Sequence, residues 1–261
     1  MNEQPAVLTE RRERVLLITI NRPDARNAVN AAVATGIAAA MDELDTDGEL
    51  TLGILTGAGT GFCAGMDLKA FVAGESAWAG DRGFAGITQR GSVKPLIAAI
   101  EGFAVAGGLE IALACDIRIA KRGGGNVGLP EVTLGVLPGT GGTQRLARAL
   151  PKNKAIELMT EGKLISFEES LALGLINYIY EPENYWDEVM KYAKSFCPPN
   201  KASKAVGRIK RAVQSGPEVA FSEALAIERE LQQILFQSDD AKEGIAAYVS
   251  KPRRTAEFTG R

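Results

Sequence analysis

The stretch FAVAGGLEIALACD occupies residues 103–116, and the rest of the chain is interpreted outward from it. Gly107-Gly108 separates an apolar segment of extended type from an apolar segment with helical spacing. A Gly-Gly step allows a sharp turn and a close approach of the backbone to a ligand. A helix that begins there directs unpaired N–H groups at that ligand, with Glu110 in its first turn. This geometry suits an oxyanion, although taken alone an ordinary turn with an acid at the helix start explains the pattern slightly better.

The composition indicates one large domain, or one domain with a small appendage. The 261 residues are 46% hydrophobic and 24% charged, an ordinary balance for a protein with a packed core. The formal net charge of −2 argues against nucleic acid as a partner, because phosphate binding requires a basic excess. No apolar run reaches the roughly 18 residues of a membrane span, and the polar stretch 1–14 predicts that there is no signal peptide.

Histidine is absent from the chain, which excludes Ser-His-Asp and Cys-His catalysis and histidine-ligated zinc. Acid–base chemistry near neutral pH must then use carboxylates, lysine, tyrosine or bound water. Cys63 has no imidazole to activate it and is interpreted as a small buried residue. Together with Cys115 and Cys197 it shows no disulfide spacing, which favours a reducing cytoplasm.

Strands and helices alternate along most of the chain. Continuous apolar runs predict buried strands at 15–20, 50–56, 95–100 and 116–120. Helical spacing predicts helices at 31–44 and 144–150, the second with Thr140 or Thr143 near its N-cap. This alternation predicts βαβ units and a parallel sheet.

The C-terminal part is predicted to be all-helical, so that residues 1–195 form an α/β core and 196–261 a helical region. Within the core, Ser166 to Glu169 has the pattern of a capping box. In the helical region, we expect a long helix to begin at Ser215 to Glu218 and the next helix to be capped by Ser238 to Asp240. Helices with apolar faces must bury them on the core or on another subunit.

Three other patterns have a plain interpretation. Residues 123–128 match G-x-G-x-x-G, but Leu129-Pro130 follows instead of a helix, so this segment is predicted to be a loop. The glycine-rich segment 74–91 is expected to be a mobile or partly helical cover. Basic residues at helical spacing could grip an anionic cofactor tail, but a solvated helix face is the preferred interpretation; they are Lys201, Lys204, Arg208 and Arg211.

Glu131 is the second carboxylate of interest. Pro130 shapes the turn before it, which suits a side chain directed into a cleft, although acids next to proline are also common on solvated turns. Glu110 and Glu131 both follow turns at the edge of predicted strands, where ligands bind in open α/β sheets. Their shared position is what favours a functional role for the pair.

Three ordered motifs resemble the enoyl-CoA hydratase/isomerase (crotonase) superfamily, and the resemblance covers essentially the whole chain. They are Phe62 to Lys69, Ala106 to Asp116, and Leu129 to Leu146, while Asn21 to Ala28 fits the first loop of that family. The resemblance implies an α/β fold, a crotonase-like spiral of ββα units with a C-terminal helical trimerisation region.

The resemblance also implies an acyl-CoA substrate whose thioester oxygen lies between the backbone N–H groups of Met66 and Gly107. One such donor is typically worth about 3 kcal/mol in the transition state. Arg26 is then placed near the nucleotide phosphates. The other residues implied to line the CoA and substrate channel, largely through their backbone, are Ala28, Ala64, Met66, Asp67, Leu68, Lys69 and Gly107.

Family members that hydrate enoyl-CoAs use two glutamates, at positions filled here by Glu110 and Glu131, whereas isomerases commonly keep only the second. The resemblance therefore implies a lyase of fatty-acid metabolism that adds water to a trans-2-enoyl-CoA and gives a 3-hydroxyacyl-CoA. The two carboxylates would hold one water over the β-carbon, and the sequence leaves open which of them is the acid and which the base. No metal or redox cofactor is expected, and homotrimers, often paired into hexamers, are implied.

Two other functions stay open. One is another reaction of the superfamily on an acyl-CoA, namely isomerisation, hydrolysis or C–C cleavage, and the other is a non-catalytic acyl-CoA binder. Ala106 stands where the family has the first of three glycines, and residues 71–93, which set chain-length preference in the family, are glycine-rich here. These departures concern the shape of the acyl pocket.

Overall fold

The computed structural model describes residues 4–261. The first three residues of the polar stretch 1–14, on which the prediction of no signal peptide was based, lie outside the described residues. The strands are β1 (Val7–Arg12), β2 (Val15–Ile20), β3 (Leu52–Gly57), β4 (Leu96–Ile100), β5 (Phe103–Val105), β6 (Ile117–Lys121), β7 (Asn126–Gly128), β8 (Leu164–Ser166) and β9 (Tyr178–Tyr180).

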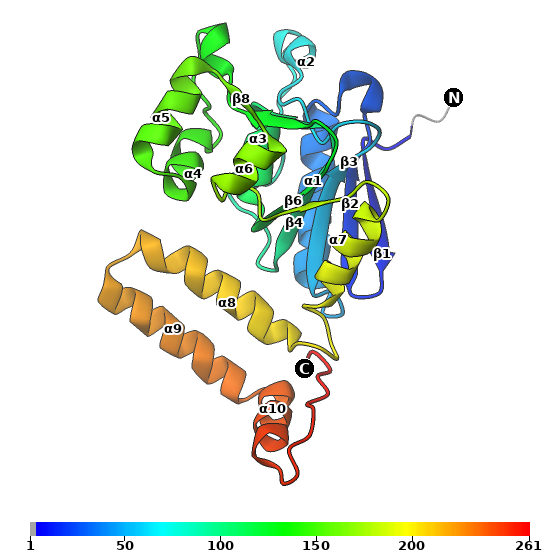
Figure 1. Cartoon of the computed structure of the whole chain (residues 1–261), viewed down its shortest axis with the longest axis vertical. Coiled ribbons are helices and arrows are strands. Elements are labelled where there is room, and N and C mark those ends of the chain that lie inside the picture. Colours follow the sequence, from blue (N-terminus) through cyan, green and yellow to red (C-terminus); the bar gives the residue numbers. More distant parts are fainter. Residues whose placement is uncertain (1–3) are drawn as a thin grey trace.

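The α-helices cover both faces of the main sheet and form the C-terminal region (Figure 1). They are α1 (Ala31–Thr46), α2 (Leu68–Val72), α3 (Gly107–Ala114), α4 (Gly142–Ala149), α5 (Lys152–Glu161), α6 (Phe167–Ala172), α7 (Tyr185–Lys194), α8 (Ser203–Ser215), α9 (Phe221–Phe236) and α10 (Asp239–Val249). Short 3₁₀ helices occur at Pro23–Ala25, Gly80–Arg82, Glu131–Leu134 and Gly216–Glu218.

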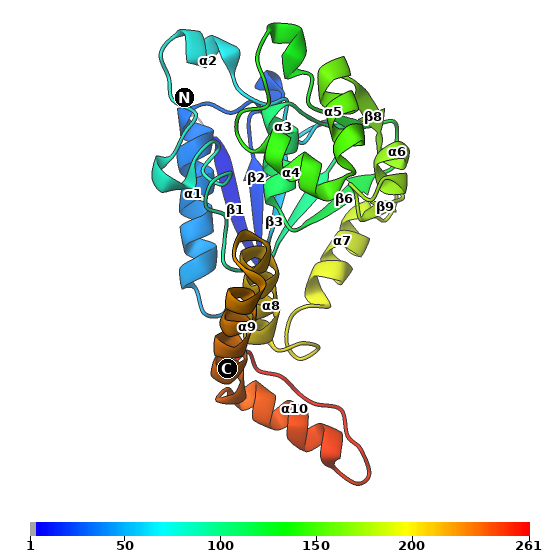
Figure 2. The same cartoon turned by 90° about the vertical axis from the view of Figure 1, so that its left-hand side faces the viewer.

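The main sheet has the strand order β1-β2-β3-β4-β6-β9, and every pair is parallel except the edge pair β1–β2. The prediction of a parallel sheet is confirmed. Successive residues of a strand face opposite sides: Leu16 and Ile18 pack with α1 and α3, while Val15 and Leu17 pack with α7. Figure 2 shows α1 and α7 on opposite sides of the strands. Burial on both faces explains why these strands are continuous apolar runs.

A second, small sheet holds the start of α3 in place. Its order is β5-β7-β8, with β5 parallel to β7 and β7 antiparallel to β8. The prediction that residues 123–128 form a loop is wrong for 126–128, because β7 is completed by hydrogen bonds to strands far away in the sequence. The polar strand β1 was likewise not expected, since its exposed side chains hide it from a hydrophobic pattern.

Two predicted helix starts lie elsewhere. The capping residue of α4 is Gly141, without a side-chain hydrogen bond, so neither Thr140 nor Thr143 caps it. Ser215 to Glu218 does not open a long helix, because α8 ends there and α9 begins at Phe221. The caps predicted at Ser166 and Ser238 are confirmed: each side chain accepts a hydrogen bond from the backbone N–H three residues on.

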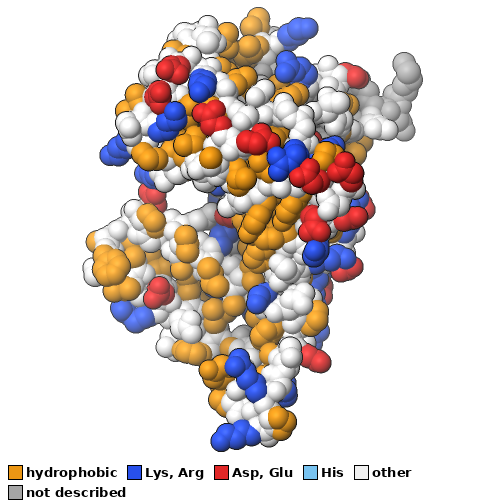
Figure 3. All heavy atoms as spheres, viewed as in Figure 1, with side chains coloured by type: hydrophobic (Ala, Val, Ile, Leu, Met, Phe, Trp, Pro, Cys, Tyr) orange, Lys and Arg blue, Asp and Glu red, His pale blue; other side chains and the backbone are white. Residues whose placement is uncertain are grey.

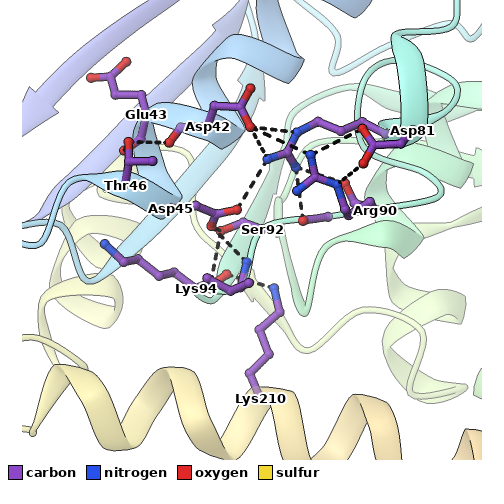
Figure 4. A network of polar contacts seen from close by, with 12 residues as sticks. Asp42, Glu43, Asp45, Thr46, Asp81, Arg90, Ser92, Lys94 and Lys210 are labelled. Carbon is purple, nitrogen blue, oxygen red and sulfur yellow. Dashed lines mark hydrogen bonds and ion pairs between the residues drawn. The ribbon is translucent and has the colours of Figure 1, made fainter.

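The glycine-rich segment 74–91 is only partly a cover, because residues 82–88 are all buried. Arg82, whose side chain is 3% exposed, donates to Asp42 and Asp45 of α1 and to two backbone carbonyls of its own segment. Asp45 also accepts from the hydroxyl of Ser92 at 2.5 Å. Figure 4 shows this network, which ties the segment to α1. A buried guanidinium is tolerated here because it is paired.

The helices after residue 200 extend away from the rest of the chain (Figures 1 and 2). The helix α8 is held by an ion pair between Lys210 and Asp116 at 2.8 Å and by a hydrogen bond between Ser203 and Thr51 at 2.7 Å. Many large apolar side chains of this region are exposed: Ile209, Val213, Phe221, Ile234, Phe236, Ile245, Tyr248 and Val249. Figure 3 shows hydrophobic side chains over these helices. Within residues 4–261 of the single chain, these side chains have no cover.

Candidate active site

The start of α3 lies beside the segment that precedes α2. Val105 donates its N–H to the carbonyl of Cys63 at 3.1 Å, and Cys63 and Ala104 form a parallel bridge. The contact is so close that a Cβ on Gly108 would lie 2.1 Å from the carbonyl oxygen of Cys63, and one on Gly65 would lie 3.0 Å from the nitrogen of Gly107. Glycine is needed at both positions because the two backbones touch.

The same contact brings together the N–H groups of Met66 and Gly107. Within residues 4–261 neither group donates a hydrogen bond to the protein. Gly107 begins a helix, so its N–H is among those without a partner in the helix itself. Ala106, just before it, has φ of +54°, a conformation in which any side chain is strained. Strain at the residue that orients a free N–H group is typical of a functional turn.

Glu110 is fully enclosed by donors. It is 2% exposed, and its Oε1 accepts from the backbone N–H groups of Thr140 and Gly142, both at 2.8 Å. Its Oε2 accepts from the hydroxyl of Thr140. Gly142 is the first residue of α4, so the positive end of that helix also faces the carboxylate. Three donors and a helix start hold this side chain in one position.

Glu131 has the opposite surroundings. It is 9% exposed, and its Oε2 is buried without a hydrogen-bond partner among residues 4–261. Burial is the largest cause that raises the pKa of Glu131 to about 7, and the charge of Glu110 acts in the same direction. Near neutral pH this carboxyl can therefore hold or release a proton. The influence of Glu110 on it also shows that the two predicted acids lie close together.

The predicted CoA-channel residues lie along two adjacent segments, 26–29 and 64–69. Ala64 donates to the carbonyl of Arg26 at 3.1 Å, and Val29 forms a parallel bridge with Met66. The guanidinium of Arg26 lies 4.7 Å from the ring centroid of Phe103. Ala28 is half-buried beside them.

The side chain of Asp67 stabilises the start of α2. Its carboxylate caps α2 by accepting from the N–H groups of Lys69 and Ala70, both at 3.1 Å, and pairs with Arg22 at 3.0 Å. These donors, the Ala70 N–H first, lower its pKa. Asp67 is thus left only its backbone for a ligand, whereas Leu68 and Lys69 are exposed.

Two other predicted features supply no side chain to the chemistry of this site. Lys204, Arg208 and Arg211 line a groove at the start of β3 and β4, beside residues such as Leu50 and Val93, and do not join the two glutamates. Cys63 is fully buried, and burial raises the pKa of its thiol to about 12, so the interpretation as a packing residue is retained.

No set of three or more metal-ligating side chains occurs within residues 4–261. None of the described helices is long and apolar enough to cross a membrane.

Sequence reasoning missed four residues around the site. Thr140 and Gly142 hold Glu110, yet Thr140 was assigned to a helix cap. Phe84 fills the space against Gly107, where an added Cβ would lie 2.8 Å from its ring. Thr88 is buried in the same segment, whose glycine-rich composition carries no period. The GTGGT run at 139–143 was the one available signal, because glycines often mark close backbone approach.

Known proteins resemble the chain over its whole length. The model of the enoyl-CoA hydratase/isomerase family matches residues 10–261. A probable enoyl-CoA hydratase of Rhizobium meliloti is 39% identical, with 98% of each chain covered. The 2,3-dehydroadipyl-CoA hydratase of Escherichia coli is 34% identical, with 98% of this chain and 99% of the relative covered.

The fold is also shared with solved structures. The crystal structure of an enoyl-CoA hydratase from Mycobacterium marinum superposes with a TM-score of 0.92 at 43% identity, covering 99% of this chain and 100% of the other. The predicted crotonase-like α/β fold is therefore confirmed.

Proposed function

The chain belongs to the enoyl-CoA hydratase/isomerase family, and from this premise we propose that it is a hydro-lyase that adds water to a trans-2-enoyl-CoA and gives a 3-hydroxyacyl-CoA. One observation carries the proposal: Glu110, enclosed by three donors, lies in the first turn of the helix that begins with the N–H of Gly107, and its charge acts on Glu131, whose Oε2 is buried without a partner among residues 4–261. Related proteins named as enoyl-CoA hydratases over the full length support it.

In the proposed mechanism the N–H groups of Met66 and Gly107 hold the thioester oxygen. They stabilise the negative charge that this oxygen gains as the enolate forms, and each is worth about 3 kcal/mol by analogy with other oxyanion holes. Arg26, Ala28 and Ala64, with the backbone of 66–69, would bind the CoA part. Acyl-CoA binding agrees with the family.

We assign the roles of the two glutamates from their surroundings. Glu110, held in place by three donors, accepts a proton from water while the water oxygen bonds to the β-carbon. Glu131, protonated near neutral pH, gives its proton to the α-carbon. The enzyme returns to its first state when the proton on Glu110 passes to Glu131. No metal or redox cofactor is needed for these steps, since a water and two carboxyl groups account for every bond and proton.

The test is an activity panel of trans-2-enoyl-CoAs of different acyl length. We expect loss of the absorbance of the conjugated thioester and a product one water heavier by mass spectrometry. Glu110→Gln and Glu131→Gln should each lower kcat by about 10²–10⁴-fold. An isomer of equal mass would instead identify an isomerase, release of free CoA and the acid a hydrolase, and shorter fragments a C–C lyase. Acyl-CoA binding and activity that are unchanged in the double variant Glu110→Gln with Glu131→Gln would identify a non-catalytic binder.

We further propose that the chain assembles into trimers, or pairs of trimers, through residues 196–261. The exposed apolar side chains of α8, α9 and α10 support this, because contiguous apolar surface of that kind marks an interface. The free, buried thiols of Cys63, Cys115 and Cys197 support a reducing compartment such as the cytoplasm.

A further inference from the structure

Arg145 lies in the first turn of α4, beside the loop that holds Glu110. Its Nη1 donates to the carbonyl of Thr140 at 3.4 Å, and its backbone N–H donates to the carbonyl of Gly141 at 2.8 Å. The guanidinium and Gly141 are in contact, since a Cβ on Gly141 would lie 1.9 Å from Nη1. Thr140, whose carbonyl Arg145 holds, is the residue whose N–H and hydroxyl both donate to Glu110. Arg145 therefore supports the loop from the side of Thr140 that does not bind the acid.

The same guanidinium also holds a segment that is distant in the sequence. Its Nη2 donates to the carbonyl of Thr88 at 2.5 Å. Thr88 closes a turn with Phe84, because the N–H of Thr88 donates to the carbonyl of Phe84 at 3.2 Å, and both residues are buried. The ring of Phe84 packs against Gly107, where an added Cβ would lie 2.8 Å from it. One side chain thus connects the loop that holds Glu110 with the segment that packs against the proposed oxyanion donor.

Packing alone does not account for an arginine at this position. Arg145 is half-buried, its side chain donates only to neutral carbonyls, and among residues 4–261 it makes no ion pair. Burial lowers its pKa, and the charge of Glu110 acts against that decrease. An apolar side chain would avoid the cost of removing a charge from water. A guanidinium, however, has a planar and rigid set of donors, which suits it to bond two carbonyls of different segments at once.

We propose that Arg145 is a positioning residue, a clamp that fixes Glu110 relative to the N–H of Gly107 by tying together the two segments that support them. The clamp acts through Thr140 on the acid and through Phe84 on the oxyanion donor. This inference rests on the proposed function, because it relates the acid and the donor that hydration uses. Loss of the clamp should slow the chemical step more than it weakens substrate binding, since the acid and the donor must be correctly placed together in the transition state.

Hydration kinetics of Arg145 variants with crotonyl-CoA test the clamp. Arg145→Gln should lower kcat about 10–10²-fold, the effect of a small misplacement of catalytic groups. KM should stay within about threefold of the wild-type value, because the change removes no contact with the CoA part. Arg145→Lys keeps the charge without the planar set of donors and should lose kcat to a similar extent. Guanidinium ions at a low, non-denaturing concentration should restore kcat of Arg145→Ala, whereas methylammonium ions should not.

The matched control is Arg118, another half-buried arginine whose side chain donates only to carbonyls, those of Leu175, Ala112 and Cys115. Arg118→Ala should lower the free energy of unfolding but leave kcat of the folded protein unchanged, with or without guanidinium. An equal fall in kcat for Arg118→Ala would overturn the clamp, because the loss would then follow from general destabilisation. A wild-type kcat in Arg145→Gln, or no rescue of Arg145→Ala by guanidinium, would also overturn it.

Amide hydrogen exchange without substrate separates this inference from the proposed function. In Arg145→Gln, peptides that cover 84–91 and 139–142 should both exchange at least about fivefold faster than in the wild type, while peptides of β2 and β3 stay unchanged. Unchanged exchange in either of the two segments would overturn the clamp, whatever reaction the chain catalyses. Faster exchange in both segments, with a wild type that hydrates no enoyl-CoA, would support the clamp and refute the proposed function alone.

Discussion

At the scale of single residues, Glu110 and Glu131 differ in what surrounds their carboxyl groups. Thr140 and Gly142 supply three donors to Glu110, while Glu131 has a buried oxygen without a partner within residues 4–261. Two identical side chains therefore have different surroundings: donors hold Glu110 in place, whereas burial raises the pKa of Glu131 and favours its neutral form.

Thr140→Val should lower kcat about tenfold or more, because it removes a hydrogen bond to a charged group while keeping the side-chain shape. Steady-state hydration kinetics measure the effect. Thr140→Ser, which keeps the hydroxyl, should restore most of the activity. Thr160→Val removes a hydroxyl from an exposed position on α5 and should have no effect. An unchanged kcat in Thr140→Val would show that the hydroxyl does not position Glu110.

The raised pKa of Glu131 predicts a pH-dependent cost in stability. The folded-state pKa of about 7 lies above the ordinary 4.5, so the folded chain binds the proton more tightly than the unfolded chain. The stability that this provides is fully present below pH 4.5 and is lost as the pH rises through 7. The free energy of unfolding of Glu131→Gln, compared with that of the wild type, should therefore increase by roughly 1–3 kcal/mol as the pH rises from 4.5 to 8.5.

Denaturant unfolding at several pH values measures that gain, and Glu161→Gln, an exposed change at the end of α5, is the control. If the difference in free energy of unfolding between Glu131→Gln and the wild type does not vary with pH, the raised pKa of Glu131 is contradicted.

The raised pKa also predicts that kcat/KM of the wild type falls as the pH rises above about 7, because Glu131 then loses the proton that it donates.

At the scale of elements, the site depends on the contact between the start of α3 and residues 62–66. Hydrogen bonds from β5 to Cys63 set this contact, and the small sheet β5-β7-β8 holds β5. Backbone touches backbone there, so the position of both oxyanion donors is determined by glycines and not by side chains.

Gly108→Ala should destabilise the fold by about 1–3 kcal/mol or more and lower kcat, because the new Cβ would lie 2.1 Å from the carbonyl oxygen of Cys63. Gly48→Ala is the matched control, since a Cβ at Gly48 meets nothing within 4 Å; its effect should stay within about 0.5 kcal/mol. Denaturant unfolding and hydration kinetics test both variants. Wild-type stability in Gly108→Ala would mean that the two backbones are not in contact.

At the scale of the whole molecule, the core and the last three helices differ in how their apolar side chains are covered. The sheet is covered on both faces within one chain, whereas α8, α9 and α10 extend from it with exposed apolar side chains (Figure 3). Phe221 is 79% exposed and Ile209 62%. The division into a core at 1–195 and a helical region at 196–261 stays a prediction, as does the assembly.

The assembly can be measured by analytical ultracentrifugation. We expect the mass of three or six chains, and we expect the double change Ile209→Asp with Phe221→Asp to give monomers, because charges placed in an apolar interface oppose association. Ile156→Asp, at an equally exposed position on α5, should leave the mass unchanged. A monomeric wild type would contradict the interface.

The sequence by itself determined the local features of this protein. The apolar runs predicted β2, β3, β4 and β6, Gly107-Gly108 marked the start of α3, and the motif pattern indicated the family. These features depend on neighbours in the chain, which a linear pattern contains.

Only the tertiary structure decided the features that join distant residues. It paired β7 with β5 and β8, moved Thr140 from a helix cap to Glu110, and buried Phe84 and Thr88 beside the site. It also distinguished the surroundings of the two glutamates. The physical reason is that hydrogen bonds and burial between segments more than 20 residues apart depend on where the whole chain is placed, and no local spacing carries that information.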